Sequence, residues 1–179
     1  AAQAQASPAN RAPLPAQPPS GDPGGGYIFQ DEFDGPAGSA PDPSKWLVQT
    51  WQDDVWPPVL GIYRNDRRNV FVDGNSNLVL LATNEMGTFY GGKLRGIWRG
   101  MINQTWEARI KLDCLTPGAW PAFWAVNEDP LPDGEVDIFE WYGNDTWAPG
   151  TTVHAASNGK TWEGKSIPGL VDNAWHTWR

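Results

Sequence analysis

The sequence predicts an all-β protein, built as an antiparallel sandwich of two sheets, and three observations support this. The 179 residues include 20 Gly and 17 Pro, about a fifth of the chain, which favours many tight turns over long helices. Short apolar runs alternate with polar residues in steps of two, and loops rich in Pro, Gly, Asn and Asp separate them. No segment keeps a period of about 3.6 residues over a helix's length, which excludes a helical bundle.

Residues 1–26 are rich in Ala, Pro, Gln and Gly and show no hydrophobic periodicity. Such a segment buries too little apolar surface to offset the entropy lost on ordering, so we predict a disordered tail. A tail of this kind fits an exported protein after signal removal, or a trimmed chain. We therefore expect a folded domain over residues 27–179 and a secreted or extracellular location.

The first predicted strands form a hairpin. Asn69–Val72 and Leu78–Thr83 are apolar runs, and the polar segment Asp73–Asn77 between them predicts a five-residue loop. Further strands are predicted at Thr105–Leu112, Glu135–Tyr142, Thr151–Ala155 and Trp175–Arg179. In the first of these, Trp106, Ala108 and Ile110 share one face, and Glu107, Arg109 and Lys111 share the other.

The strand that begins at Glu135 is the most informative. On a regular strand Glu135 and Asp137 share a face, while Glu140 points into the core, which is costly for a carboxylate. A one-residue bulge near Ile138–Phe139 removes the conflict and brings all three acids to one face. The Cα atoms of Glu135 and Glu140 would then lie about 13 Å apart, and their side chains can lean together as in retaining glycosidases.

Three acids at this spacing have a specific chemical use. Like charges held close do not all ionise easily, so one carboxyl keeps its proton while another stays a nucleophile. The chain also has 12 Trp, and flat apolar rings are what a sugar-binding groove needs. The segment 118–124 enters just before the acidic strand and would line the same groove. A solvated acidic face, a calcium site and two core tryptophans are the alternative interpretations.

Charge and composition exclude several classes. With 13 Lys+Arg against 21 Asp+Glu, the net charge of −8 provides no basic surface for nucleic acid or an anionic membrane. No apolar run is long enough for a membrane helix. Two His and a single Cys indicate that no catalytic metal is held.

Five segments, in order, resemble glycoside hydrolase family 16: FQDEFDG (29–35), NVFVDGNSNLVL (69–80), WEARIKL (106–112), GAWPAFW (118–124) and EVDIFE (135–140). The last is similar to the family's E-x-D-x-x-E signature in its bulged form. The match looks most similar to bacterial endo-β-1,3-glucanases of the laminarinase type, actinobacterial ones among them. The resemblance implies a jelly-roll β-sandwich with a concave cleft.

The resemblance also implies roles for individual residues. Glu135 would be the nucleophile of a retaining hydrolysis, Glu140 the acid/base, and Asp137 the group that tunes the nucleophile. Substrate-binding positions would be Glu107 and Arg109, which hydrogen-bond sugar hydroxyls, Trp120 and Trp124, which stack or form the cleft wall, and His154, also in the cleft. An exposed ion pair between Glu107 and Arg109 is the alternative for those two, and His176 is expected to be structural.

No cofactor would be required, although some family members carry a structural calcium ion, which Glu32 would help to bind. The partner would be a β-glucan polysaccharide or oligosaccharide, bound by a monomer. Family domains continue past the position of Arg179, so we expect the domain to be incomplete at its C-terminus. The segment 129–134 lacks the Trp that many laminarinases carry there, which leaves mixed-linkage glucan, a galactan or transglycosylation open. A non-catalytic jelly-roll carbohydrate-binding protein is the remaining alternative.

Overall fold

The computed structural model describes residues 26–50, 61–101, 103–126, 135–143, 151–157, 162–168 and 172–179, with only the backbone described for 151–157 and 162–168. The chain divides into two compact units, one up to residue 102 and the other Asn103–Arg179. Each unit is described by itself. The predicted tail at residues 1–26 lies outside the described residues except for its last position.

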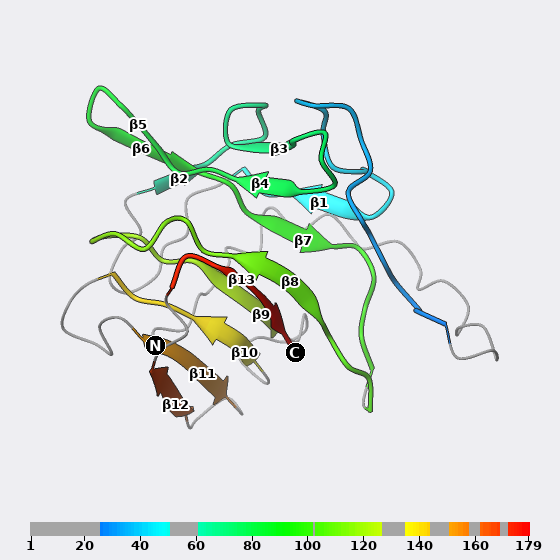
Figure 1. Ribbon diagram of the computed structural model, residues 1–179, viewed down its shortest axis with the longest axis vertical. Helices are drawn as coiled ribbons and strands as arrows, with labels where there is room; N and C mark the ends of the chain where they lie inside the picture. Colours follow the sequence, from blue (N-terminus) through cyan, green and yellow to red (C-terminus); the bar gives the residue numbers. More distant parts are fainter. Residues whose placement is uncertain are drawn as a thin grey trace. The chain divides into compact units, whose positions relative to one another are not determined.

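All regular secondary structure among the described residues is β-strand (Figure 1), so the predicted all-β class is confirmed. In the described part of the chain no helix is long and apolar enough to cross a membrane. The strands of the first unit are β1 (Trp46–Val48), β2 (Gly61–Tyr63), β3 (Val70–Val72), β4 (Leu78–Leu80), β5 (Thr83–Glu85), β6 (Thr88–Gly91) and β7 (Leu94–Gly96).

The predicted hairpin of the first unit is confirmed as β3 and β4. Val70 lies opposite Leu80 and Val72 opposite Leu78, which leaves residues 73–77 as the loop. The Asp73 side chain closes this loop, since its Oδ1 accepts the backbone N–H groups of Asn75 at 2.7 Å and Asn77 at 3.1 Å. An Asp at the first loop position therefore satisfies donors that no strand partner reaches.

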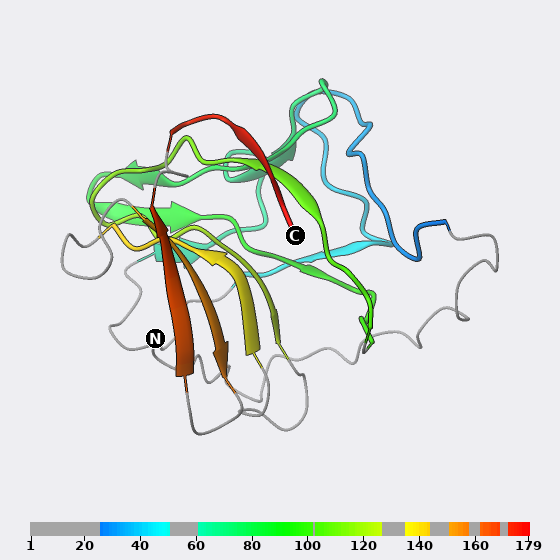
Figure 2. The same cartoon turned by 60° about the horizontal axis from the view of Figure 1, so that its bottom comes forward.

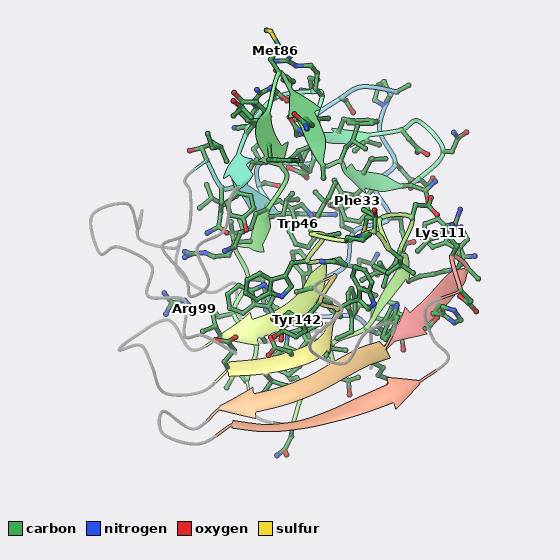
Figure 3. All side chains as sticks on the ribbon, turned by 90° about the vertical axis from the view of Figure 1, so that its left-hand side faces the viewer. Phe33, Trp46, Met86, Arg99, Lys111 and Tyr142 are labelled. Carbon is green, nitrogen blue, oxygen red and sulfur yellow. The ribbon has the colours of Figure 1, made fainter. Side chains whose placement is uncertain are left out.

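The other strands of the first unit form two further groups. β1 pairs with β7, and β2, β6 and β5 form a sheet in that order. The β2–β6 pair is parallel, which differs from the wholly antiparallel arrangement predicted. The residues between β2 and β6 form three other strands, and this long connection is what a parallel pair requires. Met86 lies at the tip of the β5–β6 hairpin and points away from it (Figure 3).

The second unit holds the remaining strands: β8 (Ala108–Lys111), β9 (Ala122–Val126), β10 (Glu135–Glu140), β11 (Thr151–Ser157), β12 (Trp162–Pro168) and β13 (Trp175–Trp178). β9 to β12 lie side by side in one antiparallel sheet, in the order β12-β11-β10-β9 (Figure 2). β13 pairs with β8, where Thr177 lies opposite Arg109 and Trp178 opposite Ala108. The predicted strand at the end of the chain is thus confirmed.

The core of the second unit forms around Leu112, Phe139 and Trp178, which are all buried. The Phe139 and Trp178 rings lie 4.5 Å apart between centroids, and Ile110 and Phe123 pack against the cluster. Because Ile110 points to this core, the alternation predicted for β8 is confirmed, and Arg109 and Lys111 are exposed. The face of the β9–β12 sheet that meets this core is therefore apolar, and the acidic side chains of β10 lie on the opposite face.

Candidate active site

The register around β10 contains a β-bulge at the position that the sequence predicted. On the β9 side Asp137 lies opposite Trp124 and Phe139 opposite Phe123, so β10 advances two residues while β9 advances one. The same irregularity occurs against β11, between Asp137 and Glu140. Ile138 is the extra residue, and it packs toward the core cluster.

The bulge decides which side chains share a face. Ala122, Trp124 and Val126 alternate along β9, so they lie on one face of the sheet. Their partners on β10 are Glu140, Asp137 and Glu135 in that order. The three acids therefore lie on one face, as predicted, while Phe139 and Phe123 meet on the apolar face with ring centroids 6.5 Å apart.

Two of the three acids are deeply buried. Asp137 is 3% exposed and Glu140 is 6% exposed. Burial, together with the nearby charges of Glu140 and Glu135, raises the pKa of Asp137 to about 8. Asp137 consequently keeps its proton at neutral pH, so the three carboxyl groups carry fewer than three negative charges.

Aromatic side chains enclose the Glu140 carboxyl. The indole Nε1–H of Trp120 donates a hydrogen bond to Oε1 of Glu140 at 2.7 Å. The Trp120 ring also lies 5.3 Å from the ring of Tyr142, centroid to centroid. Tyr142, in the stretch after β10 (Figure 3), is buried, and burial followed by the proximity of Glu140 raises the pKa of its hydroxyl.

The segment 118–124 differs from the expectation of a single loop lining a groove. Its first half is a loop that carries Trp120, whereas Phe123 and Trp124 belong to β9. Of the two tryptophans in this segment, only Trp124 is held by the sheet register, opposite Asp137. Tyr142 was not a predicted site residue, although a period of two starting from Glu140 points to it.

Glu107 and Arg109 lie away from the apolar core, on the exposed side of β8 and the residue before it. The Arg109 guanidinium stacks 4.7 Å from the ring centroid of Trp175, which is itself exposed on β13. This cation–π contact orients Arg109. Whether these two residues bind sugar stays a prediction.

The two histidines and the predicted calcium binding remain to be placed in the structure. The backbone of His154 lies in β11 opposite Lys165, and its side chain is outside the described residues, as is the whole segment 129–134. His176 accords with a structural role, because its Nε2 lies 2.7 Å from Oδ1 of Asp172. Within the described ranges, no group of three or more His, Cys, Asp or Glu side chains is arranged to hold a metal ion. Glu32 is exposed, and calcium binding there stays a prediction.

Comparison with known proteins matches residues 63–179 to the profile described as Glycosyl hydrolases family 16. No curated protein matches the chain. Among solved structures, an uncharacterized protein from Mycobacterium paratuberculosis is 55% identical with a TM-score of 0.70; the match covers 85% of this chain and 64% of that one.

Two other solved structures are similarly related. An immunostimulatory antigen and pseudo β-1,3-glucanase of Mycobacterium tuberculosis is 52% identical, with a TM-score of 0.74 and coverage of 84% of this chain and 65% of that one. A β-1,3-glucanase from Mycobacterium marinum is 47% identical, with a TM-score of 0.76 and coverage of 87% and 67%. The chain thus spans less than two thirds of the length of the first two relatives.

Proposed function

Because the chain belongs to glycoside hydrolase family 16 and has the fold of its β-1,3-glucanases, we propose that it hydrolyses internal β-1,3-glucosidic bonds of laminarin-like glucans with retention. The observation that carries this proposal is the bulge at Ile138, which brings Glu135, Asp137 and Glu140 to one face of β10. Double displacement requires two carboxyl groups close enough to flank one scissile bond, and a common strand face brings these side chains together.

In this mechanism Glu140 gives its proton to the leaving oxygen while the Glu135 carboxylate attacks the anomeric carbon. The bond between the sugar and its leaving group breaks, and a covalent glycosyl-enzyme forms. Glu140, now ionised, then takes a proton from water, which displaces Glu135 with a second inversion. Asp137 keeps its proton at neutral pH, so it can donate a hydrogen bond to the Glu135 carboxylate without adding a further negative charge.

The substrate is a β-glucan polymer or oligosaccharide, held by Glu107, Arg109, Trp124 and His154. The β-1,3 linkage is favoured because a relative with 47% identity is described as a β-1,3-glucanase. The protein works outside the cell as a monomer and requires no cofactor, with any calcium ion near Glu32 serving the fold alone. Mixed-linkage glucan and galactans are the competing substrates within the same chemistry.

A second candidate function is glucan binding without hydrolysis. Glu140 is 6% exposed and one of its carboxyl oxygens already accepts the Trp120 indole N–H, so the carboxyl is shielded from a sugar oxygen. The description of the Mycobacterium tuberculosis relative as a pseudo β-1,3-glucanase favours the same interpretation.

The test measures reducing ends released from laminarin by the chain and by Glu135→Gln, with binding followed by calorimetry. Hydrolysis requires turnover in the wild type and its loss in E135Q, with laminarin still bound. Azide distinguishes the two glutamates: E135A should form an α-glycosyl azide and E140A a β-glycosyl azide, since azide replaces the nucleophile in one and water in the other. Binding with no turnover supports the second candidate, and equal release from laminarin and agarose contradicts the β-1,3 assignment.

A further inference from the structure

The loop that carries Trp120 is fixed to the residues that follow β10. The N–H of Gly118 donates to the carbonyl of Gly143 at 2.6 Å, and the N–H of Gly143 donates to the carbonyl of Ala119 at 2.9 Å. A third bond joins the N–H of Trp141 to the carbonyl of Pro121 at 3.1 Å. These bonds continue the β9–β10 pairing past the end of the strands, so the backbone on both sides of Trp120 is held.

Gly143 allows this close approach. A Cβ at this position would lie 2.5 Å from the carbonyl oxygen of Thr116 and 3.0 Å from the nitrogen of Ala119, both backbone atoms. Only glycine therefore lets the two segments meet. The loop that carries Trp120 is therefore held by its backbone.

The indole N–H of Trp120 donates a hydrogen bond to only one oxygen of Glu140. Nε1–H can only donate, and a donor pairs best with a carboxyl oxygen that carries no proton. When Glu140 is protonated, its proton therefore resides on Oε2 while Oε1 accepts the indole N–H at 2.7 Å. Oε2 is buried and has no partner of ordinary hydrogen-bond geometry among the described residues, and the hydroxyl of Tyr142 is the polar group that interacts with this carboxyl besides the indole.

We propose that Trp120 is a positioning residue for the acid/base: its indole N–H holds Oε1 of Glu140 and thereby assigns proton transfer to Oε2. This inference rests on the proposed function. It gives Trp120 a role different from the sugar stacking that the sequence led us to expect. The indole is 36% exposed, and its ring packs on Tyr142 while its N–H is directed at the carboxyl.

Two complementary substitutions distinguish a role of Trp120 as a hydrogen-bond donor from a role as a ring that stacks on sugar. Trp120→Phe keeps an aromatic ring beside Tyr142 and removes the N–H. Trp120→Gln removes the ring but keeps an N–H donor, at the same number of bonds from the backbone as the indole nitrogen. Trp178→Phe makes the same change as W120F in the core, where Nε1 has no hydrogen-bond partner among the described residues, and serves as the matched control.

The readout compares two leaving groups. Laminarin needs a proton at its leaving sugar oxygen, whereas dinitrophenyl β-laminaribioside releases a stable phenolate that needs none. We expect W120F to lose roughly 10- to 100-fold in kcat/KM on laminarin and less than about threefold on the dinitrophenyl substrate, because only acid catalysis is misaligned. W120Q should stay within about fivefold of the wild type on laminarin, and W178F should affect both substrates alike.

Each outcome decides between the interpretations. The inference is overturned if W120F loses kcat/KM equally on both substrates, or if W120Q loses more kcat/KM than W120F. Either result supports sugar stacking as the role of Trp120. A wild-type chain that binds laminarin but releases neither sugar ends nor phenolate supports glucan binding alone and contradicts the proposed hydrolysis. The contact is checked without turnover by the indole N–H resonance assigned to Trp120 through its absence in W120F. At one fixed pH the resonance should differ between the wild type and Glu140→Gln, because the indole N–H donates to a carboxyl oxygen in one and to an amide in the other. An unchanged resonance also overturns the inference.

Discussion

Asp137 and Glu140 share one face of β10 although three positions separate them, because Ile138 is the extra residue of a bulge. On a regular strand an odd separation turns the two side chains to opposite faces, and Glu140 would replace an apolar residue in the core. The bulge therefore lets one short segment place an aromatic side chain in the core and its acidic side chains on the opposite face. Phe139 fills the core, and the carboxyls on either side of the bulge meet beside Trp124 and Trp120.

Deleting Ile138 tests this account. The deletion leaves a strand that alternates regularly, so Asp137, Phe139 and Glu140 should keep their faces and their partners on β9. We expect a folded protein that loses about 2–3 kcal/mol of unfolding free energy, since only a partly buried Ile is removed. Deleting Val136 instead moves Glu135 to the apolar face and should abolish the cooperative urea transition. Equal destabilisation by the two deletions contradicts the register.

The raised pKa of Asp137 predicts a pH-dependent stability. The carboxyl pKa is near 3.8 when unfolded and about 8 when folded, so the folded state holds the proton more tightly. Its contribution to stability is full below pH 4 and is lost as pH rises toward 8, at no more than about 1.4 kcal/mol per pH unit. Urea unfolding at pH 5 to 9 should show a shallower decline for Asp137→Asn. Asp113→Asn, at an exposed site in the same unit, should keep the wild-type slope.

Phe139 and Val136 form a matched pair on β10. Phe139 is 2% exposed and packs on Trp178, whereas Val136 is 53% exposed. We expect Phe139→Ala to lower the unfolding free energy by about 3–5 kcal/mol, because it leaves a cavity in the core of this unit. Val136→Ala should change it by less than about 0.5 kcal/mol. Urea unfolding monitored by Trp fluorescence measures both, and similar values would contradict the difference in burial between these two positions.

Two glycines of the first unit separate backbone strain from steric contact. Gly38 and Gly74 both have positive φ, 78° and 85°. A Cβ at Gly38 meets nothing within 4 Å, while one at Gly74 lies 3.0 Å from both Cβ and N of Ala37. Gly38→Ala should cost about 1–2 kcal/mol from strain alone, and Gly74→Ala at least about 1 kcal/mol more. Equal thermal unfolding temperatures for the two variants would show that the loop relaxes around the extra methyl group.

Much of the site was predictable from β10 alone. The three acids, their common face and the bulge at Ile138–Phe139 all follow from spacing and from the cost of burying an unpaired carboxylate. The hairpin around Asp73–Asn77 and the alternation of β8 follow equally from local pattern. These features depend on neighbours in sequence, and a period of two is enough to find them.

The parallel β2–β6 pair and the contact between Trp120 and Glu140 were not predictable in this way. Strand partners are chosen by long-range packing, and no local signal in Gly61–Tyr63 indicates pairing with Thr88–Gly91. Likewise, the resemblance placed Trp120 at a cleft wall. Its N–H meets Glu140 only because Gly143 lets two backbone segments approach each other.

The all-β class, the acidic face of β10 and the family follow from residue type and periodicity. The protonation of Asp137 and the hydrogen bond to Glu140 depend on how the folded chain packs. Burial and the approach of like charges set a carboxyl's pKa, and both arise from groups brought together by folding. The sequence therefore identifies the residues of this site. Which carboxyl oxygen accepts a hydrogen bond and which carries the proton depends on packing in the folded protein.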